Sequence, residues 1–241
     1  MKPPRTALIT GATAGIGRSY AEHLASLGTH VVLVARDQQR LEQLAANLAA
    51  RTTTEVLVAD LANRADLERV AHSDVDLVVN NAGFGLTSPF LSGRSDAEHA
   101  LIDVLVTAVM AVTHAALPGM VSRGSGGVIT VSSVAGWMTS GTYSAAKAWA
   151  TTFSESMYLQ TKRTGVHVMA LCPGYTRTEF HARANMTIDS IPQWMWLDVD
   201  QLVAQSLRDF ERRKPVSVPS IKYRLLALLA QYLPRPWVRQ L

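Results

Sequence analysis

The sequence contains a tyrosine and a lysine whose spacing lets them act on one ligand. Tyr143 and Lys147 form a Tyr-x-x-x-Lys pair at the start of a helical pattern over residues 143–162, so both side chains lie on one helix face. A nearby ammonium group favours the phenolate and would lower the tyrosine pKa, which makes the phenol usable as an acid or base. Ser133 ends a predicted strand shortly before them. Its hydroxyl could hold a substrate carbonyl for Tyr143, so the three residues predict proton transfer at a carbonyl or alcohol oxygen.

A glycine-rich turn forms a second candidate site. Gly11, Gly15 and Gly17 lie between a predicted strand at 6–10 and a predicted helix that ends near Leu27. Glycines allow a tight turn and let the backbone approach a pyrophosphate, which the free amides and dipole of the helix N-terminus stabilise. The spacing is G-x-x-x-G-x-G rather than the common G-x-G-x-x-G of dinucleotide-binding proteins. The turn therefore indicates a nucleotide site of a different pattern.

The end of the second predicted strand indicates which nucleotide is bound. In this kind of fold an acidic residue there binds the adenosine ribose hydroxyls, whereas arginine accommodates a 2′-phosphate. Ala35 occupies the acidic position and Arg36 follows it. A guanidinium group suits phosphate through its charge and forked donors. NADP(H) is thus favoured, NAD(H) stays possible, and the alternative is that Arg36 is only a surface residue beside Asp37.

These residues need a scaffold, and the pattern along the chain predicts one. Short runs rich in β-branched residues alternate with longer helical patterns. The predicted strands lie at 6–10, 31–35, 55–59, 77–79, 127–131 and 166–171, and the main predicted helices lie at 15–27, 37–50, 65–71, 96–117, 143–162 and 199–210. Strands this apolar predict a parallel sheet covered on both faces. We expect a single α/β domain over residues 1–241, with a doubly wound, Rossmann-like sheet.

Composition excludes several classes of protein. The chain has 241 residues, of which 48% are hydrophobic and 17% charged, so disorder is not expected. No run approaches about 18 apolar residues, which argues against an ordinary membrane-spanning helix. Cys172 is the single cysteine and allows no intrachain disulfide, which fits a cytoplasmic location. No spacing typical of metal ligands or of nucleic-acid binding is present, so neither partner is expected.

Two segments of the chain are open to more than one interpretation. The predicted helix at 96–117 is apolar almost all round, which predicts burial in the core or against another subunit. A basic amphipathic tail at about 215–241 carries an apolar stripe flanked by basic residues. The stripe comprises Leu225, Leu228, Leu229, Tyr232 and Leu233, and the flanking residues are Lys222, Arg224, Arg235 and Arg239. We expect the tail to close the fold or contact a second subunit; the alternative is a helix in a membrane interface.

In their order and context, these motifs resemble the short-chain dehydrogenase/reductase family, in its compact single-domain branch. The resemblance covers roughly residues 6–178. It rests on Thr10-Gly11 through Gly17, Asp60-Leu61, Asn80-Asn81-Ala82-Gly83, Ser133, Tyr143 with Lys147, and Pro173-Gly174 followed by Thr178. It implies hydride transfer between a nicotinamide and a carbonyl or alcohol, and a homodimer or homotetramer.

The resemblance also implies roles for individual residues. Tyr143 would be the general acid or base, Lys147 would hold the nicotinamide ribose, and Ser133 would orient the carbonyl. The implied cofactor-binding positions are Thr10, Gly11, Gly15, Ile16, Gly17, Asp60, Leu61, Asn81, Ala82, Gly83, Pro173, Gly174, Tyr175, Thr176 and Thr178. The protein would supply orientation and proton transfer, while the cofactor supplies the organic chemistry.

The sequence departs from the family pattern at one position that matters for activity. Leu105 stands where the family usually has an asparagine, and leucine cannot hydrogen-bond a water of a proton path. A nucleotide-binding sensor or scaffold with impaired turnover is therefore the alternative function.

The segment at about 176–200 is expected to cover the substrate. It contains Phe180, Trp194, Met195 and Trp196, and together with Trp137 and Met138 these side chains predict an apolar lid for a lipophilic ketone or acyl chain. The alternative is that they simply pack against the domain.

Overall fold

The computed structural model describes residues 3–72, 74–184, 186, 191–232 and 236. Its centre is a parallel sheet in the order β3-β2-β1-β4-β5-β6-β7. The strands are β1 (Thr6–Thr10), β2 (His30–Ala35), β3 (Thr54–Val58), β4 (Leu77–Asn80), β5 (Gly127–Val131), β6 (His167–Leu171) and β7 (Val216–Ser217). The prediction of a doubly wound parallel sheet is confirmed. The short strand β7 was not predicted.

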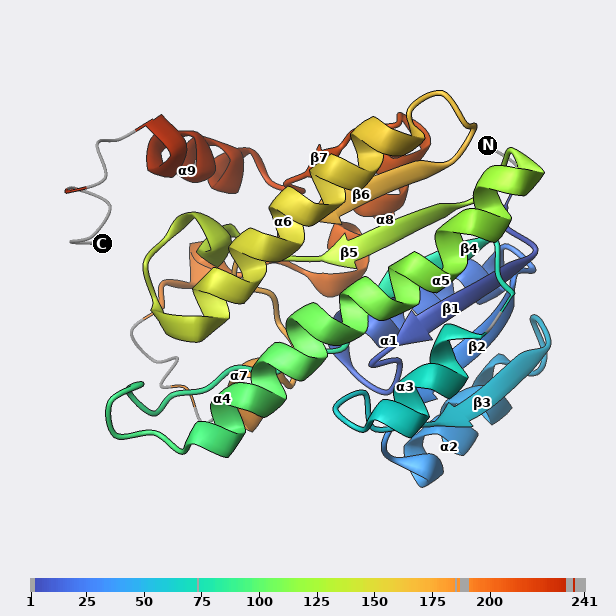
Figure 1. Ribbon diagram of the computed structural model, residues 1–241, viewed down its shortest axis with the longest axis horizontal. Helices are drawn as coiled ribbons and strands as arrows, with labels where there is room; N and C mark the ends of the chain where they lie inside the picture. The colour runs from blue at the N-terminus through green and yellow to red at the C-terminus, as the bar shows by residue number, and fades with distance from the viewer. Residues whose placement is uncertain (1–2, 73, 185, 187–190, 233–235, 237–241) are drawn as a thin grey trace.

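Helices cover both faces of the sheet because successive strand residues alternate in direction. Ala7 and Ile9 pack in one core, with α1 (Gly15–Ser26), α2 (Gln38–Leu48) and α8 (Val199–Glu211). Leu8 packs in the core on the opposite face, with α3 (Arg64–Ala71), α5 (Ala108–Arg123) and α6 (Gly141–Thr161). Figure 1 shows α3, α5 and α6 side by side in front of the sheet. Buried residues on both faces account for strands with little polar character.

Three of the helices covering the sheet begin at polar residues that cap them. The Asn63 side chain accepts from the amides of Ala65 and Asp66 at the start of α3. The Asp37 carboxylate accepts from the backbone amide of Arg40 at the start of α2. The Asp198 carboxylate accepts from the amides of Asp200 and Gln201 at the start of α8. Each cap satisfies amides that have no partner inside the helix.

The helix predicted at 96–117 differs from the observed one in where it ends, in the geometry of its middle segment and in how far the single chain buries it. It runs over Ser95–Arg123 as α4 (Ser95–Ile102), a π-helical segment at Asp103–Thr107, and α5. It therefore continues past Pro118 and stops where Gly124 adopts a left-handed conformation with φ 67°. Met110 stays 47% exposed, so the core of the single chain does not bury this helix on all sides, and burial against another subunit stays a prediction. One face packs on the sheet and the other faces outward.

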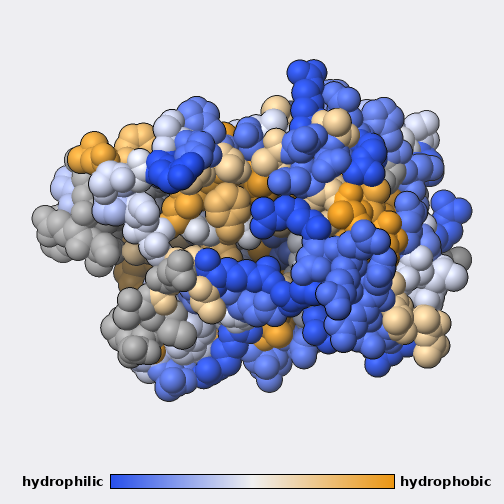
Figure 2. All heavy atoms as spheres, turned by 90° about the horizontal axis from the view of Figure 1, so that it is seen from below, coloured by the Kyte–Doolittle hydropathy of each residue, from blue (hydrophilic) through white to orange (hydrophobic). Residues whose placement is uncertain are grey.

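Length and composition alone would allow Ser95–Arg123 to cross a membrane. In the fold this helix lies over β4 and β5 and beside α3. Figure 2 shows a neighbouring face of the molecule, seen from below, that is mainly hydrophilic with small separate hydrophobic patches.

The C-terminal part of the chain contains two short elements that the sequence pattern did not resolve, α7 (Phe180–Arg183) and a 3₁₀ turn at Gln193–Met195. The helix α9 (Ile221–Tyr232) lies within the predicted amphipathic tail. The side chains that close the fold from α9 are Tyr223 and Ala227, not the predicted stripe, because the stripe lies on the opposite side of the helix. Of the residues predicted to act there, Leu233, Arg235 and Arg239 lie outside the described residues.

Candidate active site

The candidate site forms where the order of the strands reverses, between β1 and β4. Chains that leave neighbouring strands in opposite directions open a crevice at the carboxyl edge of the sheet. The hydroxyl of Thr10, at the end of β1, accepts from the backbone amides of Asn81 and Ala82, which follow β4. The side-chain amide nitrogen of Asn81 (Nδ2) donates to the carbonyl oxygens of Thr10 and Gly11. These bonds fix the glycine-rich turn against β4 and give Asn81 a positioning role.

The glycine-rich turn presents unpaired amides at the start of α1. Gly11 and Gly15 adopt left-handed conformations, with φ of 67° and 51°, which glycine accepts without a steric penalty. The N-cap residue Ala14 makes no side-chain hydrogen bond, and the first turn contains no acidic residue. The first amides of α1 therefore have no side-chain cap and are available to an anion. This local chemistry fits the pyrophosphate of a dinucleotide.

Close packing accounts for two of the glycines. A Cβ on Gly17 would lie 2.4 Å from the carbonyl oxygen of Gly11, and one on Gly15 would lie 2.9 Å from the side chain of Thr178. Thr178 thus packs directly on the glycine-rich turn, although it lies in the segment after β6, far from the turn in the sequence. Ile16 packs against the core beneath this turn.

The residues predicted to bind the adenosine half lie at the ends of β2 and β3. Arg36 follows β2 with an exposed side chain, and Asp37 caps α2. The Asp60 carboxylate accepts from the backbone amide of Ala62, and the adjacent Leu61 is buried. Because the amide of Ala12 donates to the carbonyl of Val34, the end of β2 is joined to the glycine-rich turn. Arg36 therefore lies at the carboxyl edge of the sheet, near the glycine-rich turn.

The three predicted catalytic residues come together at the ends of β5 and α6. The Ser133 hydroxyl lies near enough to the Tyr143 hydroxyl to lower its pKa, and it accepts from the backbone amide of Ala135. The ammonium group of Lys147 lies 5.6 Å from the centre of the Tyr143 ring and donates to the carbonyl oxygen of Val131 at 2.7 Å. Ser132 supports the group by donating to the carbonyl oxygen of Lys147. This arrangement can hold a carbonyl oxygen between two hydroxyl groups.

The electrostatics of this group differ from the sequence prediction. Burial raises the pKa of Tyr143 to about 12, and the hydrogen bond from Ser133 opposes that shift. Burial also lowers the pKa of Lys147 to about 8. The pKa of Tyr143 is therefore raised rather than lowered, because burial dominates the shift. With its phenol protonated, Tyr143 can act as a proton donor.

Leu105 fills the space next to this group. It is 2% exposed and packs with Leu101, Ala146 and Tyr143. A Cβ on Gly83 would lie 2.7 Å from its methyl group and 3.8 Å from the Lys147 ammonium nitrogen. Leu105 thus provides apolar surroundings for Lys147, on the π-helical segment, where an asparagine would place a polar amide.

An aromatic cluster covers the catalytic tyrosine. The ring of Phe180 lies 5.9 Å from that of Tyr143, and His181 packs against Phe180, Tyr175 and Trp196. These contacts agree with part of the predicted apolar lid. Trp194 and Met138, in contrast, are 61% and 37% exposed, and residues 185 and 187–190 lie outside the described part of the chain.

The Pro173-Gly174 turn is set by a residue from α9. A Cβ on Gly174 would lie 2.0 Å from the Tyr223 ring. The Tyr223 hydroxyl accepts from the amide of Tyr175 and donates to the carbonyl of Met195. The hydroxyl of Thr176 donates to the carbonyl of Gly174. The turn, the lid and α9 therefore share one anchor.

Sequence reasoning missed an ion-pair cluster beside the glycine-rich turn. Arg40 binds the Glu179 carboxylate through two nitrogens, at 3.0 and 2.7 Å, and also donates to the carbonyl of Thr13. Arg183 makes a further bond to Glu179 at 2.6 Å. The two arginines hold the pKa of Glu179 at about 2. The cluster ties α2 to the lid segment, and no local sequence signal could have paired residues so far apart.

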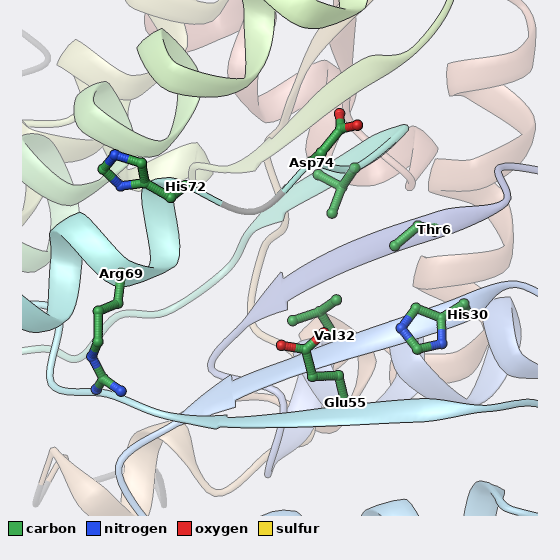
Figure 3. A pocket seen from close by; sticks show the side chains of 8 residues that line it. Thr6, His30, Val32, Glu55, Arg69, His72 and Asp74 are labelled. Atoms are coloured by element: carbon green, nitrogen blue, oxygen red, sulfur yellow. The ribbon is translucent and has the colours of Figure 1, made fainter.

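A hollow of about 400 Å³ lies elsewhere, among the starts of β1, β2 and β3 and the end of α3. Figure 3 shows side chains from these elements around it. His30 pairs with Thr53, and Asp74 pairs with Arg123. This hollow is at the amino edge of the sheet, away from the catalytic group, and its polar groups serve the fold.

The sheet order, the glycine-rich turn and the Ser133–Tyr143–Lys147 group define a nucleotide-binding α/β protein with a site for proton transfer. Residues 5–189 match the model of the short chain dehydrogenase family. The chain belongs to this family.

The chain is similar both to a protein described as inactive and to dehydrogenases of known structure. The chain is 32% identical over 193 residues to the human "Inactive hydroxysteroid dehydrogenase-like protein 1", a match that covers 75% of this chain but 58% of the relative. It is 33% identical to a short-chain dehydrogenase from Sphingobium yanoikuyae solved in complex with NADPH, with a TM-score of 0.86 and coverage of 95% and 96%. It is 29% identical to the "bulky-bulky ketone specific alcohol dehydrogenase" from Comamonas testosteroni, with a TM-score of 0.83 and coverage of 98% and 96%.

Proposed function

We propose that this chain is a cytoplasmic NADP(H)-dependent oxidoreductase that acts on apolar ketones, secondary alcohols or ketoacyl compounds. The observation that carries the proposal is the gathering of Ser133, Tyr143 and Lys147 at the ends of β5 and α6, with the Lys147 ammonium group 5.6 Å from the centre of the Tyr143 ring and an uncapped, glycine-rich start of α1. The NADPH complex of the Sphingobium structure supports the choice of cofactor.

The residues of this chain perform the proton transfer and the orientation. Ser133 and Tyr143 hold the carbonyl oxygen, and in reduction the phenol gives that oxygen its proton while the carbonyl carbon receives the hydride. In oxidation the phenolate takes the proton back from the alcohol. Lys147 places a positive charge beside the developing phenolate, which favours its formation. The nicotinamide, when bound, supplies or accepts the hydride.

The lid supports an apolar substrate of at least medium size. Phe180 lies over Tyr143, and Trp196 with Tyr175 continues the apolar surface. Aromatic rings offer large apolar contact areas and little hydrogen bonding. The Comamonas structure, whose enzyme is described as specific for bulky ketones, supports the same class.

A comparison of ketones tests the proposed activity. We expect the purified chain to oxidise NADPH with a bulky aromatic ketone at a kcat/KM at least ~10-fold above that for acetone, because each added apolar group gains burial under the lid. NADPH absorbance measures the rate. Higher kcat/KM values for small polar ketones or sugars would contradict the proposed substrate class.

The proposed cofactor preference depends on Arg36. We expect Arg36→Ala to raise the Kd of NADPH by about 10- to 100-fold, because hydrogen bonds to a charged phosphate are strong. The Kd of NADH should stay unchanged, because NADH lacks the 2′-phosphate. Quenching of tryptophan fluorescence measures both constants.

Arg51→Ala provides the matched control for Arg36. Arg51 is exposed beyond the end of α2, so its removal deletes one positive charge outside the site. Equal losses in the two variants, or equal effects of Arg36→Ala on NADPH and NADH, would show that Arg36 does not read the phosphate.

A second candidate function rests on Leu105. A protein that binds the nucleotide without useful turnover would have the same fold, and Leu105 occupies the position next to Lys147. The human relative, which is described as inactive, supports this alternative. NADPH binding without oxidation by any ketone of a broad panel would favour it.

Self-association is part of the proposal. Exposed apolar side chains remain on α5 and α6, with Met110 47% and Leu159 68% exposed. We propose a homodimer or homotetramer that covers these helices.

A further inference from the structure

The last described helix, α9, has one buried side and one apolar exposed side. Tyr223 and Ala227 face the protein and are 2% and 4% exposed. The outward residues are large and apolar, with exposures of 75% for Ile221, 59% for Leu225, 48% for Leu228, 56% for Leu229 and 83% for Tyr232. Figure 1 shows α9 at the edge of the molecule, beyond α6 and away from the sheet. This exposed stripe therefore lies on a protruding part of the surface.

Basic residues border the stripe on both sides. Successive helix residues are about 100° apart, which places Lys222 on one side of the stripe and Arg224 on the other. Trp194 extends the apolar surface beyond the helix, since the Lys222 ammonium group lies 5.7 Å from the centre of its ring. An apolar stripe between two basic edges, with aromatic rings near its ends, is typical of a helix that lies in a membrane interface.

Acidic side chains do not balance this charge within the segment. The sequence contains no Asp or Glu after Glu211, whereas seven Lys and Arg residues follow it. Lys214 is paired with Asp209, but Lys222 and Arg224 on α9 have no such carboxylate among their hydrogen-bond partners in the described part of the chain. The Lys222 ammonium donates to the carbonyl oxygen of Trp194, and Arg224 donates to that of Val218. Carbonyl oxygens carry no net charge, so both positive charges remain to attract an anionic surface.

We propose that α9, together with Trp194, lies in the surface of an anionic lipid bilayer. A second copy of the same helix offers apolar contacts but no carboxylate for Lys222 and Arg224, because α9 contains none. An acidic protein partner would match the charge, but the flexible leucines and the aromatic ends suit acyl chains and headgroups better. The inference goes beyond the proposed oxidoreductase function and does not depend on it.

The position of α9 gives this surface a relation to the site. Tyr223 projects from the opposite side of the helix. Its hydroxyl binds the backbone of Tyr175, next to the Pro173-Gly174 turn, and of Met195, in the lid. The helix also packs on the turn at Val134–Trp137, directly after Ser133. A bilayer that holds α9 would therefore lie next to the lid of the candidate site.

Vesicle flotation with the full chain tests the proposal. We expect it to float with vesicles of phosphatidylcholine and phosphatidylglycerol, and much less with phosphatidylcholine alone or at high salt. Leu225→Glu with Leu229→Glu should abolish flotation. Lys222→Gln with Arg224→Gln should lower the partition coefficient about 30-fold, which corresponds to two basic residues at an anionic surface.

Leu91→Glu is the matched control, because Leu91 is 99% exposed on a different surface and should leave flotation unchanged. Circular dichroism confirms that each variant is folded. Absence of flotation of the folded wild type, or equal loss in the Leu91 control, would overturn the proposal. A change of oligomeric state in the Leu225/Leu229 variant without any vesicle binding by the wild type would show that a second copy covers the stripe. None of these measurements uses turnover, so failure of the proposed enzyme activity would leave them intact.

Discussion

Tyr143→Phe is expected to lower kcat for ketone reduction by about 10²- to 10⁴-fold, the usual contribution of a positioned proton donor. The substitution removes the hydroxyl that interacts with Ser133 and leaves the ring that packs against Phe180. The fold and the glycine-rich turn should therefore be unaffected. Single-turnover absorbance measurements with saturating NADPH and ketone report the chemical step.

Tyr158→Phe is the control for this result, because Tyr158 lies on the same helix but packs against His167. It should leave kcat unchanged. The Kd of NADPH should be the same in both variants. If Tyr143→Phe kept a kcat within about threefold of the wild type, Tyr143 would not be the proton donor.

Gly17→Ala is expected to abolish measurable NADPH binding and to lower stability by about 1–3 kcal/mol, the usual cost of overpacking. The added Cβ would lie 2.4 Å from the carbonyl oxygen of Gly11 and 3.0 Å from its carbonyl carbon. Backbone atoms cannot rotate away as a side chain does, so the turn itself must shift. Fluorescence titration and thermal unfolding measure the two effects.

Gly119→Ala separates this local effect from a general cost of alanine. Gly119 lies inside α5, where a Cβ would meet only the flexible end of Arg123 at 3.3 Å, so stability should stay equal or rise. A Gly17→Ala variant that bound NADPH like the wild type would show that the turn does not cradle the cofactor.

The parts of the fold that were predictable are those with a local signal. The strands at Thr6–Thr10 and Gly127–Val131 were predicted with their observed bounds, since both are buried almost throughout and flanked by turn residues. The helix through Pro118 was cut short because proline is a strong breaker in isolation, whereas packing and the left-handed Gly124 determine where it ends. Strand β7 has two residues, too few for any periodicity.

The site shows the same division. Motif residues such as Thr10, Ser133 and Tyr143 could be named from the sequence because their spacing is local or their strand ends are recognisable. The Arg40–Glu179 pair joins residues 139 positions apart, and Tyr223 meets Tyr175 across 48. Polar residues on an amphipathic helix give no sign of such partners. The raised pKa of Tyr143 depends on how much chain covers it, which no motif states.

The Tyr223 anchor has a consequence for the order of events during synthesis. Domains fold from the N-terminus as the chain leaves the ribosome. The glycine-rich turn, β4 and α6 are all made before α9. The turn at Gly174 and the lid at Met195 nevertheless receive a shared hydrogen-bonding partner only from Tyr223. A nascent chain can therefore build most of its sheet early, but its site matures only when α9, which follows those elements in the sequence, reaches it.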